Sequence, residues 1–132
     1  MIALDTNVIV RFLVADDPAQ HAVSVRVLGG VQPLFIADTV LLECCWVLKA
    51  CYDLPRAAIV DALRRVAGLP QVALENPARV ARALGWYEQG MDPADALHLA
   101  NAEAHCRSLH TFDADFVRRA KGTSGCRVTQ AR

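Results

Sequence analysis

The chain has 132 residues, of which 54% are hydrophobic, and its formal net charge is zero. This length suits one domain around one core, so we expect residues 1–132 to form a single domain. The zero net charge excludes a protein-wide positive field that would attract nucleic acid or an anionic membrane, so any nucleic-acid contact must be local.

The cysteine pattern and the apolar runs bear on compartment. Five cysteines without C-x-x-C spacing argue against a zinc knuckle or a disulfide framework. Three of them, Cys44, Cys45 and Cys51, fall in one apolar helical stretch, where we expect them to be buried. We find no charged-then-apolar leader and no apolar run long enough to span a membrane. We therefore expect a reduced, cytoplasmic protein without a membrane partner.

Short apolar strands alternate with helices along the chain, a pattern typical of an α/β fold with a parallel sheet. The expected strands span residues 2–4, 34–36, 72–74, 109–111 and 126–129. Helices are expected over residues 7–14, from Asp17-Pro18 to residue 28, over 38–51, from Pro55 onward, from Asn76-Pro77 to Gly90, over 93–106 and over 114–120. We expect a three-layer α/β/α architecture in which helices flank a short, mostly parallel sheet.

The helix expected over residues 38–51 is unusual because it is apolar almost all round. We expect Asp38 to be its N-cap. An all-round apolar helix is buried on most sides, in a core or at an interface. Glu43 is the only charged residue between Asp38 and Lys49, so it is either a ligand or the one residue of this helix that faces water.

Four carboxylates are the candidate functional residues: Asp5, Glu43, Asp95 and Asp113. Asp5 and Asp113 follow expected strands, and the carboxyl edge of a parallel sheet is where ligands bind. Helix capping is an alternative role for Asp5, for Asp92 and for either Asp113 or Asp115. We interpret Phe112 and Phe116 as core residues. Asp95 and His98 are also spaced to hold zinc together, but no second His or Cys has matching spacing.

Taken in order, these motifs resemble the PIN-domain ribonucleases, in particular the VapC-type toxins of prokaryotic toxin-antitoxin pairs. The motifs are Asp5-Thr6-Asn7, a Glu in the third helix, Asp95-Ala96-Leu97-His98 and Thr111-Phe112-Asp113-Ala114-Asp115-Phe116. The resemblance implies that Asp5, Glu43, Asp95 and Asp113 are catalytic and bind metal. It implies supporting roles for Thr6, Asn7, Asp92, Thr111 and Asp115.

The resemblance implies a metal-dependent endoribonuclease, with RNA as substrate, a cognate antitoxin that covers the active site, and a homodimer. Hard cations prefer oxygen ligands, so the expected cofactor is Mg²⁺ or Mn²⁺. Candidate phosphate contacts are Arg11, Arg107, Arg118 and Arg119.

Two other functions remain open. A non-catalytic protein-interaction module is favoured by the high apolar share, which predicts apolar surface left over for a partner. An aspartate-nucleophile phosphatase also begins with an Asp after the first strand, but it requires a second Asp where this chain has Asn7.

Overall fold

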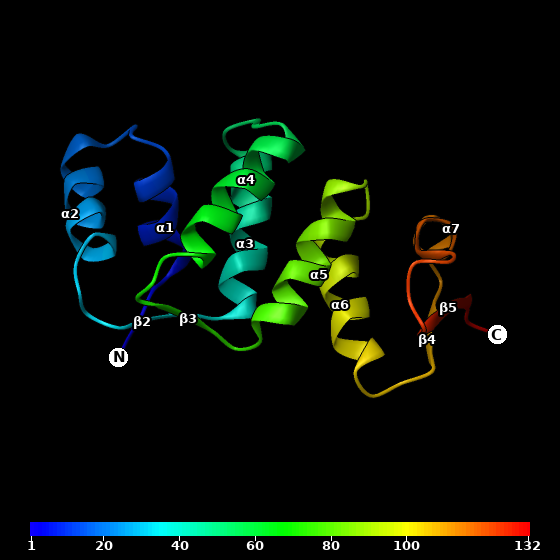
Figure 1. The fold of residues 1–132 in the computed structure, drawn as a ribbon. Helices are drawn as coiled ribbons and strands as arrows, with labels where there is room; N and C mark the ends of the chain where they lie inside the picture. Colours follow the sequence, from blue (N-terminus) through cyan, green and yellow to red (C-terminus); the bar gives the residue numbers. More distant parts are fainter. The chain divides into compact units, whose positions relative to one another are not determined.

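The structure, a computed structural model, describes residues 1–132. The chain divides into two compact units, residues 1–75 and 76–132, which are described separately. The first unit contains β1 (Ile2–Ala3), α1 (Thr6–Leu13), α2 (Pro18–Leu28), β2 (Leu34–Ile36), α3 (Asp38–Ala50), α4 (Arg56–Ala67) and β3 (Val72–Leu74). The second contains α5 (Pro77–Glu88), α6 (Pro93–Glu103), β4 (Ser108–Thr111), α7 (Ala114–Ala120) and β5 (Arg127–Gln130) (Figure 1).

The first unit is built on a parallel sheet in the order β1-β2-β3. Its central strand β2 buries Leu34 and Ile36 on one face, and Phe35 on the other face is partly buried. Helices α1, α3 and α4 contribute fully buried side chains, among them Ile9, Leu48 and Ile59. The core therefore holds β1 in place, and the end of β1 carries Asp5.

The start of α3 differs from the sequence prediction, because Asp38 is not the N-cap. Ala37 occupies that position without a side-chain cap, and Asp38 lies in the first turn. The Asp38 backbone N–H instead donates to Glu75 Oε2 at 3.0 Å. A carboxylate from the end of the unit thus satisfies a helix N-terminal amide, as a local cap otherwise would.

Helix α3 is not buried on most sides within this chain, so burial in the core is excluded and burial at an interface stays a prediction. One face is buried, through Leu41, Cys44, Cys45 and Leu48, but Trp46 is 66% exposed. Cys51 lies beyond the last helical residue and is exposed rather than buried. Because α3 packs on α1 and α4 from one side, composition alone did not reveal that it has an outer face.

The second unit packs α5 against α6 and β4 against β5, with α7 beside both strands. β4 and β5 are parallel, with Ser108 opposite Arg127 and Thr111 opposite Gln130. Trp86, Leu99, Phe116 and Val128 belong to the core of this unit. Phe116 is therefore a core residue as predicted. The same prediction for Phe112 is wrong, since its side chain is 83% exposed.

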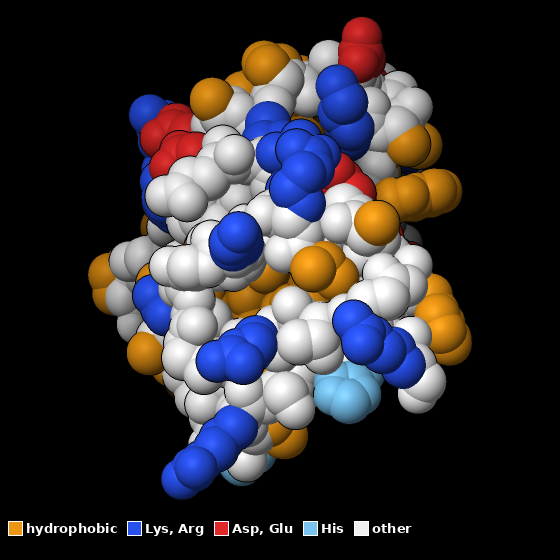
Figure 2. Space-filling view, turned by 90° about the vertical axis from the view of Figure 1, so that its right-hand side faces the viewer, with side chains coloured by type: hydrophobic (Ala, Val, Ile, Leu, Met, Phe, Trp, Pro, Cys, Tyr) orange, Lys and Arg blue, Asp and Glu red, His pale blue; other side chains and the backbone are white.

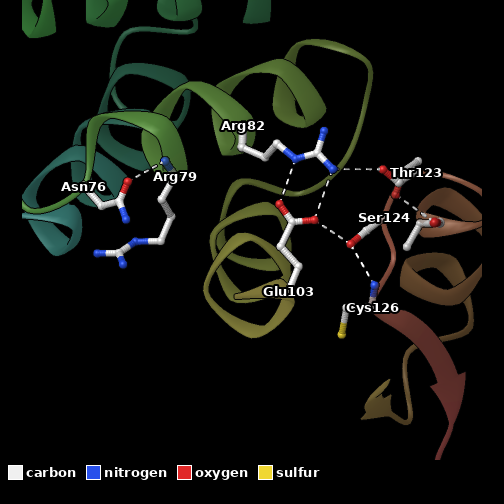
Figure 3. A network of polar contacts seen from close by, with 8 residues as sticks. Asn76, Arg79, Arg82, Glu103, Thr123, Ser124 and Cys126 are labelled. Atoms are coloured by element: carbon white, nitrogen blue, oxygen red, sulfur yellow. Dashed lines mark hydrogen bonds and ion pairs between the residues drawn. The ribbon is translucent and has the colours of Figure 1, made fainter. Parts of the chain in front are cut away.

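A polar network joins α5, α6 and the segment before β5 (Figure 3). Arg82 donates from Nε and Nη2 to the two carboxylate oxygens of Glu103, at 2.7 and 3.1 Å. Ser124 Oγ donates to Glu103 Oε2 at 2.6 Å and accepts from the Cys126 N–H at 3.0 Å. The hydrogen bonds from Arg82 and then Ser124, together with the Arg82 charge, lower the pKa of Glu103 despite partial burial. This network fixes the chain where it enters β5.

Gly90 connects α5 to the segment before α6 in a conformation that favours glycine. Its φ is +119°, and a Cβ there would lie 2.5 Å from Arg119 Nη1. Residues with a side chain rarely adopt such a φ. The glycine therefore allows both the tight turn and the close approach of Arg119.

The predicted fold class is confirmed: the protein is α/β, with seven helices and short parallel sheets. Every predicted strand and helix is present. None of the seven helices combines the length and the apolar character needed to cross a bilayer.

Candidate active site

Asp5 follows β1 and is the N-cap of α1. Its Oδ1 accepts the N–H of Thr6, the first helical residue, at 2.7 Å, whereas an N-cap side chain usually accepts from the second or third helical N–H. The capping alternative is therefore realised. However, the cap engages one carboxylate oxygen, and the side chain makes no ion pair, so the Oδ2 atom has no protein partner.

Asp5 and Glu43 line the same hollow of the first unit, about 280 Å³ in volume, together with Thr6, Asn7, Arg11 and Tyr52. Glu43 is exposed to solvent in this hollow. It lies on α3, which packs against α1. Thr6 Oγ1 is buried and has no hydrogen-bond partner. Burial raises the pKa of the neighbouring Cys44 thiol to about 12, with smaller contributions from Cys45, Glu43 and Asp5.

Arg11 lines this hollow, and its guanidinium group is already hydrogen-bonded within the protein. Its Nη1 donates to Asp16 Oδ1 at 2.7 Å and to the Tyr52 hydroxyl at 3.0 Å. Tyr52 in turn donates to Asp16 Oδ2 at 2.9 Å. These contacts, with the Tyr52 hydrogen bond largest, lower the pKa of Asp16. Sequence reasoning missed Asp16 and Tyr52, because no local pattern links residues 36 positions apart.

In the second unit, two further acids cap helices. Asp92 Oδ1 accepts the N–H groups of Ala94 and Asp95, at 2.9 and 3.1 Å. Asp113 Oδ1 accepts those of Asp115 and Phe116, at 2.9 and 3.1 Å.

Thr111 supports the turn that carries Asp113, since its Oγ1 accepts the Asp113 N–H at 3.0 Å. The end of β4 therefore presents Asp113 in a fixed conformation, again with one carboxylate oxygen free of protein contacts.

Asp95 lies in the first turn of α6, and its pKa is affected by burial and by Asp92, Asp113 and Asp115. Partial burial raises its pKa, and the negative charges of Asp92, Asp113 and Asp115 raise it further, while His98 opposes them. Asp115 differs from the others because Arg118 and Arg119 pair with it and lower its pKa. The acids around Asp95 thus repel one another, and a bound cation would relieve that repulsion.

The structure brings the predicted acids together in two sets: Asp5 with Glu43, and Asp95 with Asp92, Asp113 and Asp115. No three His, Cys, Asp or Glu side chains converge closely enough to hold a metal ion. That all four principal acids serve one metal stays a prediction. The donors themselves fit Mg²⁺ or Mn²⁺, because they are carboxylate oxygens with free lone pairs, and the hollow beside Asp5 holds the unpartnered Thr6 hydroxyl.

The four predicted phosphate-contact arginines differ in their pairing. Arg11, Arg118 and Arg119 are bound to carboxylates of Asp16 or Asp115. Arg107 is exposed at the start of β4 and forms no ion pair. Its charge is therefore the one most available to an outside anion.

Carboxylates gathered at strand ends and helix starts of an α/β fold are suited to chemistry with divalent metals. A comparison with protein-family models identifies the family: residues 2–122 match the PIN domain. The chain belongs to the PIN-domain family. PIN domains are generally nucleases, which act on RNA and typically use divalent metal ions. A search of curated proteins finds no matching relative.

Proposed function

We propose that this nuclease is a metal-dependent endoribonuclease and the toxin of a toxin-antitoxin pair. The observation that carries the catalytic part is the grouping of Asp95 with Asp92, Asp113 and Asp115: partial burial raises the pKa of Asp95, and the charges of these neighbours raise it further. A cluster of this kind, at the end of β4 and the start of α6, favours a cation that offsets its negative charge. The order of the motifs along the chain, which resembles VapC-type toxins, supports the toxin role.

Asp5, Asp95 and Asp113 are the proposed metal ligands, and Glu43 is a ligand or the residue that orients the attacking water. Mg²⁺ or Mn²⁺, when bound, neutralises charge on the scissile phosphate and makes a water more acidic. Both acid sets are proposed to serve this metal.

The protein's own contribution is positioning. Capping hydrogen bonds hold Asp5 and Asp113 in one conformation, so little side-chain entropy is lost when their free oxygens bind a ligand. Glu43 is exposed in the hollow beside Asp5, where it can accept a hydrogen bond from a water. Thr6 and Asn7 line the same hollow and offer further polar atoms for that water.

The test is RNA cleavage by the purified chain with Mn²⁺, with EDTA, and with the Asp5→Asn variant. Asn caps helices as well as Asp does, so Asp5→Asn should keep the fold and abolish cleavage. EDTA should abolish cleavage by the wild type, and added Mn²⁺ should restore it. Full cleavage by Asp5→Asn, at an unchanged melting temperature, would contradict the assignment.

The proposed partners are a cognate antitoxin and a second copy of the chain. Trp46 on α3, exposed beside the partly buried Leu42 and Val47, offers apolar surface for such contacts. Sedimentation of the purified chain tests the homodimer. Co-purification with the product of the adjacent reading frame, together with inhibition of cleavage by that product, tests the antitoxin.

A non-catalytic interaction module is the second candidate, favoured by the same exposed apolar side chains. It predicts partner binding without any EDTA-sensitive cleavage, so the cleavage assay separates the two functions.

A further inference from the structure

The sheet of the second unit has one apolar and one polar face. Leu109 and Val128 are paired across β4 and β5 and pack in the core of this unit. Because side chains alternate along a strand, the next pairs, Ser108 with Arg127 and His110 with Thr129, share the opposite face. No helix of the second unit covers that polar face fully, since Ser108, His110 and Arg127 are all exposed.

A shallow hollow of about 560 Å³ lies over this face, lined by Arg107, Ser108, His110, Gly125, Arg127 and Thr129. We call these six residues the β4–β5 face. Two guanidinium groups and one imidazole contribute to it, and no carboxylate does. The hollow is therefore built to receive an anion rather than a cation.

The positive charges of the β4–β5 face are not used within the protein. Neither Arg107 nor Arg127 forms an ion pair, whereas Arg82, Arg118 and Arg119 of the same unit all do. Glu103, near the start of β5, is committed to Arg82 and Ser124. Figure 2 shows a view with many Lys and Arg side chains and few acids.

The two arginines are also close in the fold. The Arg127 N–H donates to the Arg107 carbonyl at 2.8 Å. The two residues therefore lie side by side where β4 and β5 begin. The polar network around Glu103 fixes the chain at Cys126, directly before Arg127. The pair is thus held on a rigid support.

The β4–β5 face leads toward the acids. β4 runs from Ser108 to Thr111, a rise of about 10 Å at the usual strand spacing. At its far end, Phe112 is 83% exposed and directly precedes Asp113. A basic track that ends at an exposed aromatic ring is the arrangement that binds single-stranded nucleic acid, where cations contact phosphates and bases stack on the ring.

We propose that the β4–β5 face binds the phosphodiester backbone of single-stranded RNA, with one base stacked on Phe112, and directs the strand to the acids around Asp113. This inference rests on the proposed ribonuclease function and assigns it a surface that binds and guides the strand. An acidic protein segment would be attracted to the same charges, but it would make no use of an aromatic platform at the end of the track.

The test measures binding in EDTA, so that cleavage plays no part. Fluorescence anisotropy with a labelled oligouridylate is compared for the wild type, Arg107→Gln/Arg127→Gln and Phe112→Ala. Arg26→Gln/Arg65→Gln is the charge control, because it removes the same charge from two exposed arginines on α2 and α4 of the first unit. Of these, Arg26 forms no ion pair, and Arg65 forms an exposed one with Asp61 at 3.1 Å, which contributes little to stability.

Each single-strand phosphate contact contributes about 0.7 to the salt slope, so the Arg107→Gln/Arg127→Gln slope should be shallower by about 1.4. The affinity advantage of the wild type should then shrink by about sevenfold between about 50 and 200 mM salt. Phe112→Ala should lose affinity by about tenfold with an unchanged salt slope. The control should bind like the wild type.

Wild-type affinity in Arg107→Gln/Arg127→Gln, or an equal loss in the control, would overturn the proposal. So would equal affinity for a polyglutamate peptide, which would assign the face to an acidic protein segment. If this binding test fails while RNA cleavage is intact, only the proposed role of the β4–β5 face is refuted. If the wild type binds RNA at the β4–β5 face but does not cleave it, only the proposed ribonuclease function is refuted.

Discussion

Replacing Asp113 separates its structural role from its proposed metal-binding role. Asp113 Oδ1 caps α7 through the N–H groups of Asp115 and Phe116. Asn supplies an equivalent cap oxygen but no charge, whereas Ala supplies neither. We therefore expect Asp113→Ala to lose roughly 1 kcal/mol of unfolding free energy, and Asp113→Asn to lose only a few tenths.

Metal binding should respond differently from stability. A ligand at 100 times its dissociation constant stabilises the folded state by about 2.7 kcal/mol. We expect Mn²⁺ to raise the melting temperature of the wild type, and expect both Asp113 variants to lose most of that rise. Cleavage of RNA should be lost in both variants, although only one of them is appreciably destabilised.

Asp17 provides the matched control. It caps α2 through the Gln20 N–H at 3.0 Å and lies outside both sets of candidate ligands. Asp17→Ala should lose as much stability as Asp113→Ala while keeping cleavage and the Mn²⁺ response. The reasoning would be refuted if Asp113→Asn kept its Mn²⁺-induced stabilisation, or if Asp17→Ala lost cleavage to the same extent as Asp113→Ala.

Three further predictions concern stability and reactivity. Because the pKa of Glu103 is lowered in the folded protein, its charge stabilises the fold at pH values above the ordinary Glu pKa, and this contribution is lost as pH falls through the folded pKa. The melting-temperature difference between wild type and Glu103→Gln should therefore shrink between about pH 6 and 3. A constant difference would contradict the ion pair with Arg82. Gly90→Ala should lose roughly 1–3 kcal/mol in urea unfolding because of the positive φ, whereas Gly85→Ala, in α5 with open space around it, should not. Brief iodoacetamide treatment of the native protein should label the exposed thiols of Cys51 and Cys106 but not those of Cys44 and Cys45, whose pKa values burial raises to about 12; peptide mass spectrometry reads the result, and equal labelling of all four would refute it.

Two predictions from the sequence, for Phe112 and Asp38, were wrong for different reasons. Phe112 was expected in the core because its side chain is apolar, yet it lies between the end of β4 and the N-cap Asp113 and is exposed. Asp38 was expected to cap its own helix, but Glu75, which is 37 residues away, accepts its N–H instead. The Asp38 outcome depends on a contact between distant segments, which no local pattern encodes, whereas Phe112 shows that an apolar side chain next to a strand end need not be buried.

The sequence by itself determined the alternation of strands and helices, because hydrophobic periodicity and cap residues act within a few positions. It also indicated the capping roles of Asp5, Asp92 and Asp113, which follow strands or precede helices at positions where Asp is a good cap. The tertiary structure decided which charges are available. It paired Arg11 with Asp16, left Arg107 and Arg127 unpaired on the β4–β5 face, and surrounded Asp95 with other carboxylates. Electrostatic interaction depends on distance and solvent exposure, and folding alone sets both.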